Sequence, residues 1–118
     1  MPGFEPFDIV VLPFPFADRN ETTVRPALML TSHETFGQHS GVALVAMITT
    51  AKRSDWPFDV GIADLGAAGL KVPCLVRAKI NAVDCSLITR KIGTLGVNDR
   101  RAVGAALRGV LSEALGAS

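Results

Sequence analysis

Short apolar runs, separated by proline, glycine and polar residues, limit what this chain can fold into. The longest run, residues 42–48, is apolar at every position and ends in two threonines, which is the pattern of a strand buried on both faces. A second such run, residues 9–12, ends at Pro13. Neither run is long enough to cross a bilayer, and the chain does not open with a basic region followed by an apolar one. The sequence therefore predicts buried strands and a cytoplasmic protein without a membrane segment.

The other apolar segments are equally short and predict a mainly β fold. We expect further strands over residues 26–31, 58–62, 73–80 and 90–95, a loop with one helical turn over 32–40, and turns or short helical pieces over 63–70 and 84–89. One helix is predicted at the end, where Val103 and Leu107 belong to an apolar stripe at helical spacing and Asn98 or Asp99 would cap its start. Few long crossovers join the strands, so we expect a single domain, residues 1–118, forming a small antiparallel barrel with a helix packed on it.

Composition restricts the partners of this barrel. The 12 basic and 11 acidic residues nearly cancel, so a nucleic-acid site would have to be a local patch. The hydrophobic fraction of 48% is high and predicts a buried subunit interface. Cys74 and Cys85 have no metal or redox spacing and are expected to be small buried hydrophobes, and His33 and His39 have no metal signature. The sequence predicts neither a metal nor a cofactor.

The segment from Arg25 to Leu30 is the strongest candidate site. Pro26 cannot donate to a ladder, so it is expected at the first residue of a strand, with Arg25 on the rim. A guanidinium there could bind an incoming phosphate or carboxylate, or it could simply pair with a nearby acid. Thr49 ends the strand predicted over residues 41–50, where its hydroxyl could serve a site or satisfy a backbone group.

Further basic residues surround aromatic and polar positions. The loop after the central strand holds Lys52 and Arg53, followed closely by Trp56. Alternation in the strand 73–80 puts Arg77 and Lys79 on one basic face. Cations with a ring are the combination that single-stranded RNA requires, although Trp56 could equally pack in the core or in an interface.

Several stretches, taken in order over nearly the whole chain, resemble the MazF/PemK family of toxins from prokaryotic toxin-antitoxin systems. They are residues 8–12, 25–30, 45–49, 69–70, 76–77, 83–84 and 91–95, followed by the terminal helix. The resemblance implies an SH3-like barrel of the MazF/Kid/CcdB type, a homodimer, and a metal-independent, sequence-selective endoribonuclease that a cognate antitoxin inhibits. Carried over by position, it makes Arg25 and Thr49 catalytic, and Arg77 matches an arginine of the Kid branch. With the mix of cations and an aromatic ring described above, we expect the RNA-binding residues to be Arg19, Lys52, Arg53, Trp56, Arg77 and Lys79.

The chain departs from the family pattern at three places. Phe7 stands where family members often have glycine before Asp8, which concerns turn geometry. In the Kid branch a histidine follows the first strand and an aspartate lies near the later arginine. Here residues 18–23 contain no histidine, and Lys79 occupies the position of the aspartate.

Metal-free cleavage of RNA requires a proton acceptor for the 2′-OH, a donor for the leaving oxygen and charge stabilisation of the phosphorane. Arg25 suits phosphate clamping and proton donation, and Thr49 suits a hydrogen bond to a non-bridging oxygen. The products would carry 2′,3′-cyclic phosphates, while no residue identifies itself as the acceptor. Two alternatives use the same fold: a CcdB-like poison of gyrase that cleaves nothing, and a catalytically inactive protein-binding module.

Overall fold

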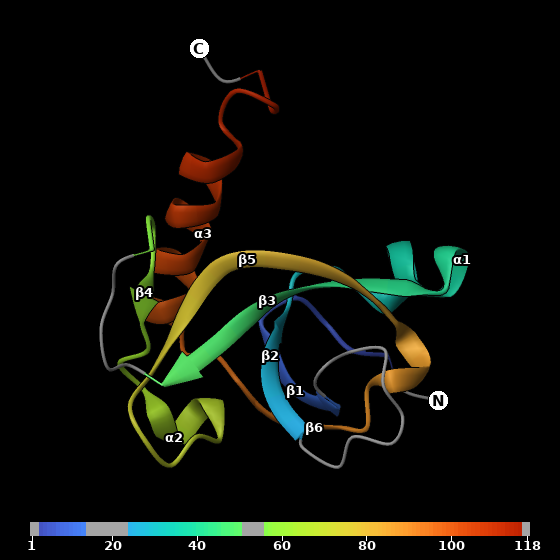
Figure 1. Cartoon of the computed structure of the whole chain (residues 1–118), viewed down its shortest axis with the longest axis horizontal. Helices are drawn as coiled ribbons and strands as arrows, with labels where there is room; N and C mark the ends of the chain where they lie inside the picture. The colour runs from blue at the N-terminus through green and yellow to red at the C-terminus, as the bar shows by residue number, and fades with distance from the viewer. Residues whose placement is uncertain (1–2, 14–23, 51–55, 117–118) are drawn as a thin grey trace.

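The structure is a computed structural model, and it describes residues 3–13, 24–50 and 56–116 (Figure 1). In chain order the elements are β1 (Asp8–Pro13), β2 (Val24–Met29), the π-helical turn η1 (His33–Gly37), α1 (Gln38–Ser40), β3 (Val42–Thr50), β4 (Val60–Gly61), α2 (Leu65–Ala68), β5 (Cys74–Asp84), the 3-10 turn η2 (Cys85–Leu87), β6 (Arg90–Thr94) and α3 (Val97–Leu111). The strands form one antiparallel sheet in the order β4-β5-β3-β2-β1-β6. The predicted mainly β fold is confirmed.

The sheet curls strongly, so that the long strand β5 arches over β3 and β2 (Figure 1). One face packs against α2 and α3, where Ile9, Leu28 and Ile48 of the sheet and Val103 of α3 are all buried. The other face contains a second cluster around Val10, which closes the inside of the curl. Because both faces are covered, residues 9–12 of β1 and 42–48 of β3 are apolar throughout, as predicted.

Pro26 is not the first residue of its strand, contrary to the expectation. It is the third residue of β2 and lies opposite Val11 of β1. The ladder between β2 and β3 begins only at Ala27, so the part of β2 that holds Pro26 is paired on one side. A proline is tolerated in such a one-sided segment because the missing N–H is not needed for the second ladder.

The terminal helix is present, but its start is not capped by Asn98 or Asp99. Helix α3 begins after Gly96, and Asp99 lies inside its first turn, 5% exposed. The Asp99 carboxylate instead accepts hydrogen bonds from the backbone N–H groups of Ala63 and Asp64, at 2.9 to 3.2 Å. It therefore fastens the segment between β4 and α2 to the helix.

Local differences from the predicted strands have local causes. Strand β4 covers only Val60–Gly61, because Phe58 has a φ of 65° and cannot continue an extended strand. Phe7 also has a positive φ, 75°, which explains why glycine suits this position and confirms that the departure concerns turn geometry. The segment 32–40 forms η1 and α1, more helix than the single turn expected.

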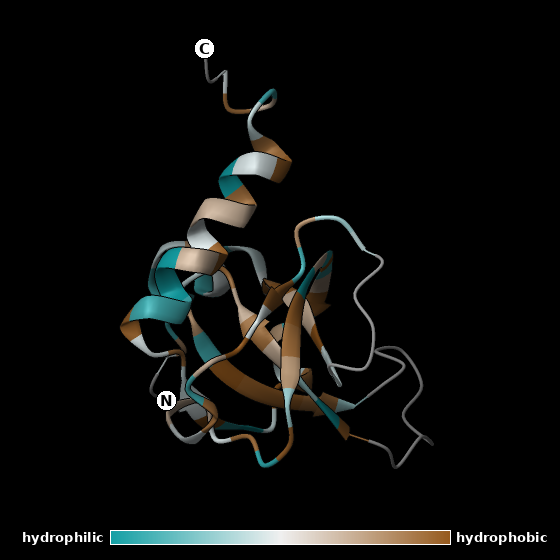
Figure 2. Ribbon diagram, turned by 90° about the vertical axis from the view of Figure 1, so that its left-hand side faces the viewer, coloured by the Kyte–Doolittle hydropathy of each residue, from teal (hydrophilic) through white to brown (hydrophobic). Residues whose placement is uncertain are grey.

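The last part of α3 extends beyond the sheet (Figures 1 and 2). Val110 and Leu111 at its end, and Leu115 just beyond it, are exposed, so the sheet of this chain does not cover the last part of the apolar stripe. None of the helices in the described ranges is long and apolar enough to cross a membrane.

Candidate functional site

Arg25 and Thr49 stand near the ends of two neighbouring strands, β2 and β3. The ladder between these strands ends with the pair Ala27 and Met47, and each of the two residues lies two positions beyond that pair. Residues two apart on a strand share a face, so both follow the face of Ala27. Arg25 is exposed and Thr49 is half-buried. Arg25 interacts with another group in this structure.

A wide groove of about 620 Å³ opens at Arg25. Its lining comes from three segments that are distant in the sequence: the start of β2, the turn after α2 and the start of β6, with Val11 of β1 between them. The described lining residues are Val11, Val24, Arg25, Pro26, Gly69, Leu70, Lys71, Arg90, Lys91 and Ile92. Four of them are cationic and none is Asp, Glu or His, so the groove suits a polyanion.

Strand register explains why the cations of the groove gather. Val11 pairs with Pro26 on one side and with Arg90 on the other, which brings β6 next to the start of β2. Lys91 Nζ lies 3.4 Å from Oδ1 of Asp8, a carboxylate that also accepts hydrogen bonds from the N–H of Glu5 and the hydroxyl of Thr94. Lys91 is therefore partly neutralised, whereas Lys71 and Arg90 form no ion pair with another residue of the described ranges.

Sequence analysis missed Lys71, Arg90 and Lys91 as candidates. Arg90 and Lys91 open a predicted strand, and Lys71 follows a glycine-dotted turn. Neither position stands out until the pairing of β6 with β1 is known. The adjacent basic pair at residues 90–91 was the available signal, since it stands at the mouth of a strand as Arg25 does.

Arg77 is held by an acidic partner that sequence analysis did not anticipate. Its guanidinium donates from Nε to Oδ1 of Asp59 at 3.2 Å and from Nη2 to Oδ2 at 2.9 Å. The Asp59 side chain is only 2% exposed. The guanidinium carbon also lies 5.3 Å from the centre of the Trp56 ring, and Trp56 is 41% exposed.

A β-bulge separates Arg77 from Lys79. Strand β3 steps from Ala46 to Met47 while β5 steps from Ile80 to Arg77, so Ala78 and Lys79 are extra residues in β5. The alternation expected over these positions is therefore interrupted, and Lys79 is exposed. Three predicted RNA-binding residues, Arg19, Lys52 and Arg53, lie outside the described residues.

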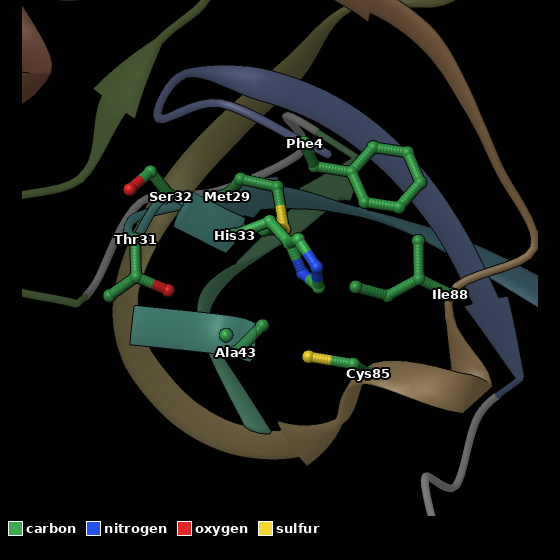
Figure 3. Close-up of a pocket in the computed structure, with 9 residues that line it drawn as sticks. Phe4, Met29, Thr31, Ser32, His33, Ala43, Cys85 and Ile88 are labelled. Atoms are coloured by element: carbon green, nitrogen blue, oxygen red, sulfur yellow. The ribbon is translucent and has the colours of Figure 1, made fainter. Parts of the chain in front are cut away.

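A small apolar cavity of about 30 Å³ lies inside the curl, lined by Phe4, Met29, His33, Cys85 and Ile88 among others (Figure 3). Burial and the neighbouring charge of Asp84 raise the pKa of the Cys85 thiol, and burial raises the pKa of Cys74. A neutral thiol is a poor nucleophile. Both cysteines act as small apolar residues, Cys74 buried and Cys85 half-buried. Within the described ranges no three His, Cys, Asp or Glu side chains form a group that could hold a metal ion.

A profile of the family described as "PemK-like, MazF-like toxin of type II toxin-antitoxin system" matches residues 5–111. This segment contains every element from β1 to α3. No curated protein matches the chain.

Solved structures share the fold over most of their length. MazF from Deinococcus radiodurans superposes with a TM-score of 0.70 at 22% identity, covering 95% of this chain and 99% of that one. The toxin MazF-mt6 from Mycobacterium tuberculosis gives a TM-score of 0.68 at 24% identity, covering 89% and 96%. An endoribonuclease from a mycobacterial species, solved with its cognate antitoxin, gives 0.71 at 14% identity, covering 92% and 95%. These likenesses establish the curled antiparallel fold.

Proposed function

Because the chain belongs to the PemK-like, MazF-like family of toxins of type II toxin-antitoxin systems, as its sequence motifs indicated, we propose that it is an endoribonuclease that cleaves single-stranded RNA. The solved endoribonuclease of the same fold supports this activity. The catalytic residues of the proposal are Arg25 and Thr49. The observation that carries it is the cationic groove at Arg25; Thr49 lies on the neighbouring strand, two residues beyond the last pair of the β2–β3 ladder.

The proposed reaction is an attack of a ribose 2′-OH on the adjacent phosphorus. The new O2′–P bond forms as the P–O5′ bond breaks, which leaves a 2′,3′-cyclic phosphate and a 5′-hydroxyl on the two fragments. Arg25 stabilises the charge that builds up on the phosphorane oxygens and can donate the proton that the leaving oxygen requires. The Thr49 hydroxyl donates a hydrogen bond to a non-bridging oxygen.

The RNA backbone runs along the cationic groove from Arg25 toward Arg90 and Lys71. Phosphate contacts of this kind position a strand without reading its sequence. The proton acceptor does not come from the described lining of this groove, since that lining contains no carboxylate or imidazole. We expect activity without a divalent metal, because the guanidinium of Arg25 supplies the charge stabilisation that a metal would otherwise provide.

A homodimer and an antitoxin partner complete the proposal. Phe58 lies against Gly109 of α3, where a Cβ would come within 2.5 Å of its ring, and it adjoins the exposed apolar end of the helix. This exposed end, formed by Phe58, Val110, Leu111 and Leu115, accounts for part of the apolar excess and suits a subunit contact. A monomer by light scattering at micromolar concentration would contradict the dimer. The antitoxin is expected to block RNA access to the groove.

One experiment tests the activity. Purified protein is added to a single-stranded RNA of mixed sequence in EDTA, and the fragments are separated and their ends identified. We expect a few discrete fragments with 2′,3′-cyclic phosphate ends, which would support sequence-selective, metal-free cleavage. Intact RNA both in EDTA and with magnesium would overturn the ribonuclease proposal and favour a toxin that acts by binding protein. Cleavage only with magnesium would overturn metal independence.

A further inference from the structure

Trp56, Arg77 and Asp59 form a stack near the proposed catalytic residue Thr49. The proposed cleavage chemistry does not use this stack. We propose that Trp56 is the platform on which one unpaired RNA base stacks, and that Arg77 is a positioning residue that holds the ring in place. The inference rests on the proposed ribonuclease function and adds a base-binding site to it.

The Arg77–Asp59 pair, on which Trp56 rests, is rigid. Both oxygens of Asp59 accept hydrogen bonds from Arg77, in the two-pronged geometry that fixes a guanidinium in orientation. The Asp59 side chain is 2% exposed and that of Arg77 is 23% exposed. A carboxylate buried to this degree requires its cation, so Arg77 is committed to Asp59 and is poorly placed to follow a phosphate.

The ring at the top of the stack is open to a ligand. The Arg77 guanidinium carbon lies 5.3 Å from the Trp56 ring centre, within the range of a cation–π contact. The guanidinium covers part of the indole, yet 41% of Trp56 remains exposed. A large aromatic surface that is both fixed and exposed loses little entropy on binding, which favours stacking with a flat ligand.

The register of β3 and β5 places this stack next to Thr49. Met47 pairs with Arg77 and Thr49 pairs with Leu75, so Thr49 and Arg77 are diagonal neighbours on adjacent strands, roughly 7 to 8 Å apart. Trp56 over Arg77 is therefore close to the phosphate oxygen that Thr49 would bind. An aromatic surface next to a phosphate-binding hydroxyl matches the two parts of a single-stranded nucleotide, its base and its phosphate.

The chain contains one tryptophan, so its intrinsic fluorescence reports on Trp56 alone. The full-length protein is titrated with a 2′-O-methyl RNA oligonucleotide, which lacks the attacking hydroxyl and stays intact. We expect saturable quenching of the fluorescence. Binding detected by anisotropy of a labelled oligonucleotide, with Trp56 fluorescence unchanged at saturation, would overturn base stacking while leaving the ribonuclease proposal in place. Quenching by an antitoxin peptide but not by the oligonucleotide would also overturn it.

Variants test the base contact. Trp56→Ala should weaken oligonucleotide binding about tenfold, whereas Val97→Ala, which shortens an exposed apolar side chain at the start of α3, should leave it unchanged. A set of oligonucleotides with one abasic nucleotide each locates the stacked base. For the wild type, the abasic nucleotide at one position should lower the affinity about tenfold. For Trp56→Ala, whose affinity is already reduced, the same abasic nucleotide should lower it only slightly further. Equal losses for both proteins at every position would contradict the proposal. Failure of the wild type both to bind and to cleave RNA would overturn it together with the proposed function.

The positioning role of Arg77 is tested with Arg77→Lys, which keeps the charge but not the two-pronged geometry. In the free variant, quenching of Trp56 by acrylamide should increase, and oligonucleotide affinity should fall toward that of Trp56→Ala. The dependence of binding on salt should keep its slope. A slope reduced by about one unit in Arg77→Ala, with acrylamide quenching unchanged in Arg77→Lys, would make Arg77 a phosphate contact instead.

Discussion

Asp59 holds Arg77 through two parallel hydrogen bonds, and this pair joins the segment before β4 to the middle of β5. The carboxylate is almost completely buried, so removing the cation takes two charge-assisted hydrogen bonds from a group that water hardly reaches.

The first prediction follows from this burial. Arg77→Ala should lower the free energy of unfolding by about 2–4 kcal/mol, because breaking a buried pair costs this much after allowance for the partial exposure of the arginine. Urea denaturation measures the change. Arg101→Ala is the control, since that arginine is exposed on α3, and it should shift stability by less than about 0.5 kcal/mol. Equal effects of the two substitutions would mean that the pair contributes nothing.

The second prediction concerns the close contact of α2 with β6 that shapes one wall of the groove. A Cβ on Gly93 would lie 2.3 Å from the carbonyl carbon of Ala68, and one on Gly69 would lie 2.0 Å from the oxygen of Ile92. Gly93→Ala should therefore destabilise the protein by more than about 2 kcal/mol. Gly61→Ala is the matched control, because no heavy atom of the described residues lies within 4 Å of its Cβ position. A Gly93→Ala protein as stable as Gly61→Ala would show that the wall is not closely packed.

The third prediction separates the groove from other basic surfaces. Arg90→Ala and Lys71→Ala should each reduce the salt slope of RNA binding by about one unit and raise KM more than they lower kcat, since phosphate contacts act mainly on binding. Lys79→Ala, in the bulge of β5, should reduce the salt slope in the same way if the bound RNA extends to β5. Arg101→Ala on α3 should leave the slope unchanged. A slope that falls for Arg101→Ala but not for Arg90→Ala would place the RNA along the helix.

The fourth prediction concerns pH. Burial raises the pKa of Cys74 above its ordinary value of 9.0, so the folded protein retains a proton that the unfolded chain loses. Stability from this source is complete below pH 9 and decreases as the pH rises above it. Cys74→Ala should lower overall stability but flatten the decrease of stability as the pH rises above 9.0. An unchanged pH profile in Cys74→Ala would assign the decrease to other groups.

Local patterns in the sequence predicted the positions of most elements, because apolar runs and turn residues act within a few neighbours. Where prediction failed, a tertiary partner decided the outcome. Asp99 was expected to cap α3, but its carboxylate bonds to the backbone at residues 63–64. Pro26 lies inside β2 because the pairing of β2 with its second neighbour, β3, begins only at the next residue, Ala27.

The candidate site shows the same division. Arg25 and Thr49 stand near strand ends that the sequence marks clearly, and these two strands pair with each other in a simple antiparallel register. The contribution of Arg90 depends on β6 returning to pair with β1, a contact across most of the chain. The partner of Arg77 is an acid in an irregular segment, so neither spacing nor periodicity could identify it.

The rate of RNA cleavage by Arg25→Ala tests the central claim most directly. Single-turnover cleavage, with the protein in saturating excess over the RNA and in EDTA, is compared for the wild type, Arg25→Ala and Thr49→Ala. Thr50→Ala is the control, because Thr50 is the neighbouring threonine on the opposite face of β3. With all four proteins folded by circular dichroism, we predict a loss of about 10²-fold or more for Arg25→Ala and Thr49→Ala and a near-normal rate for Thr50→Ala. A folded Arg25→Ala protein that cleaves RNA at the wild-type rate would contradict the account.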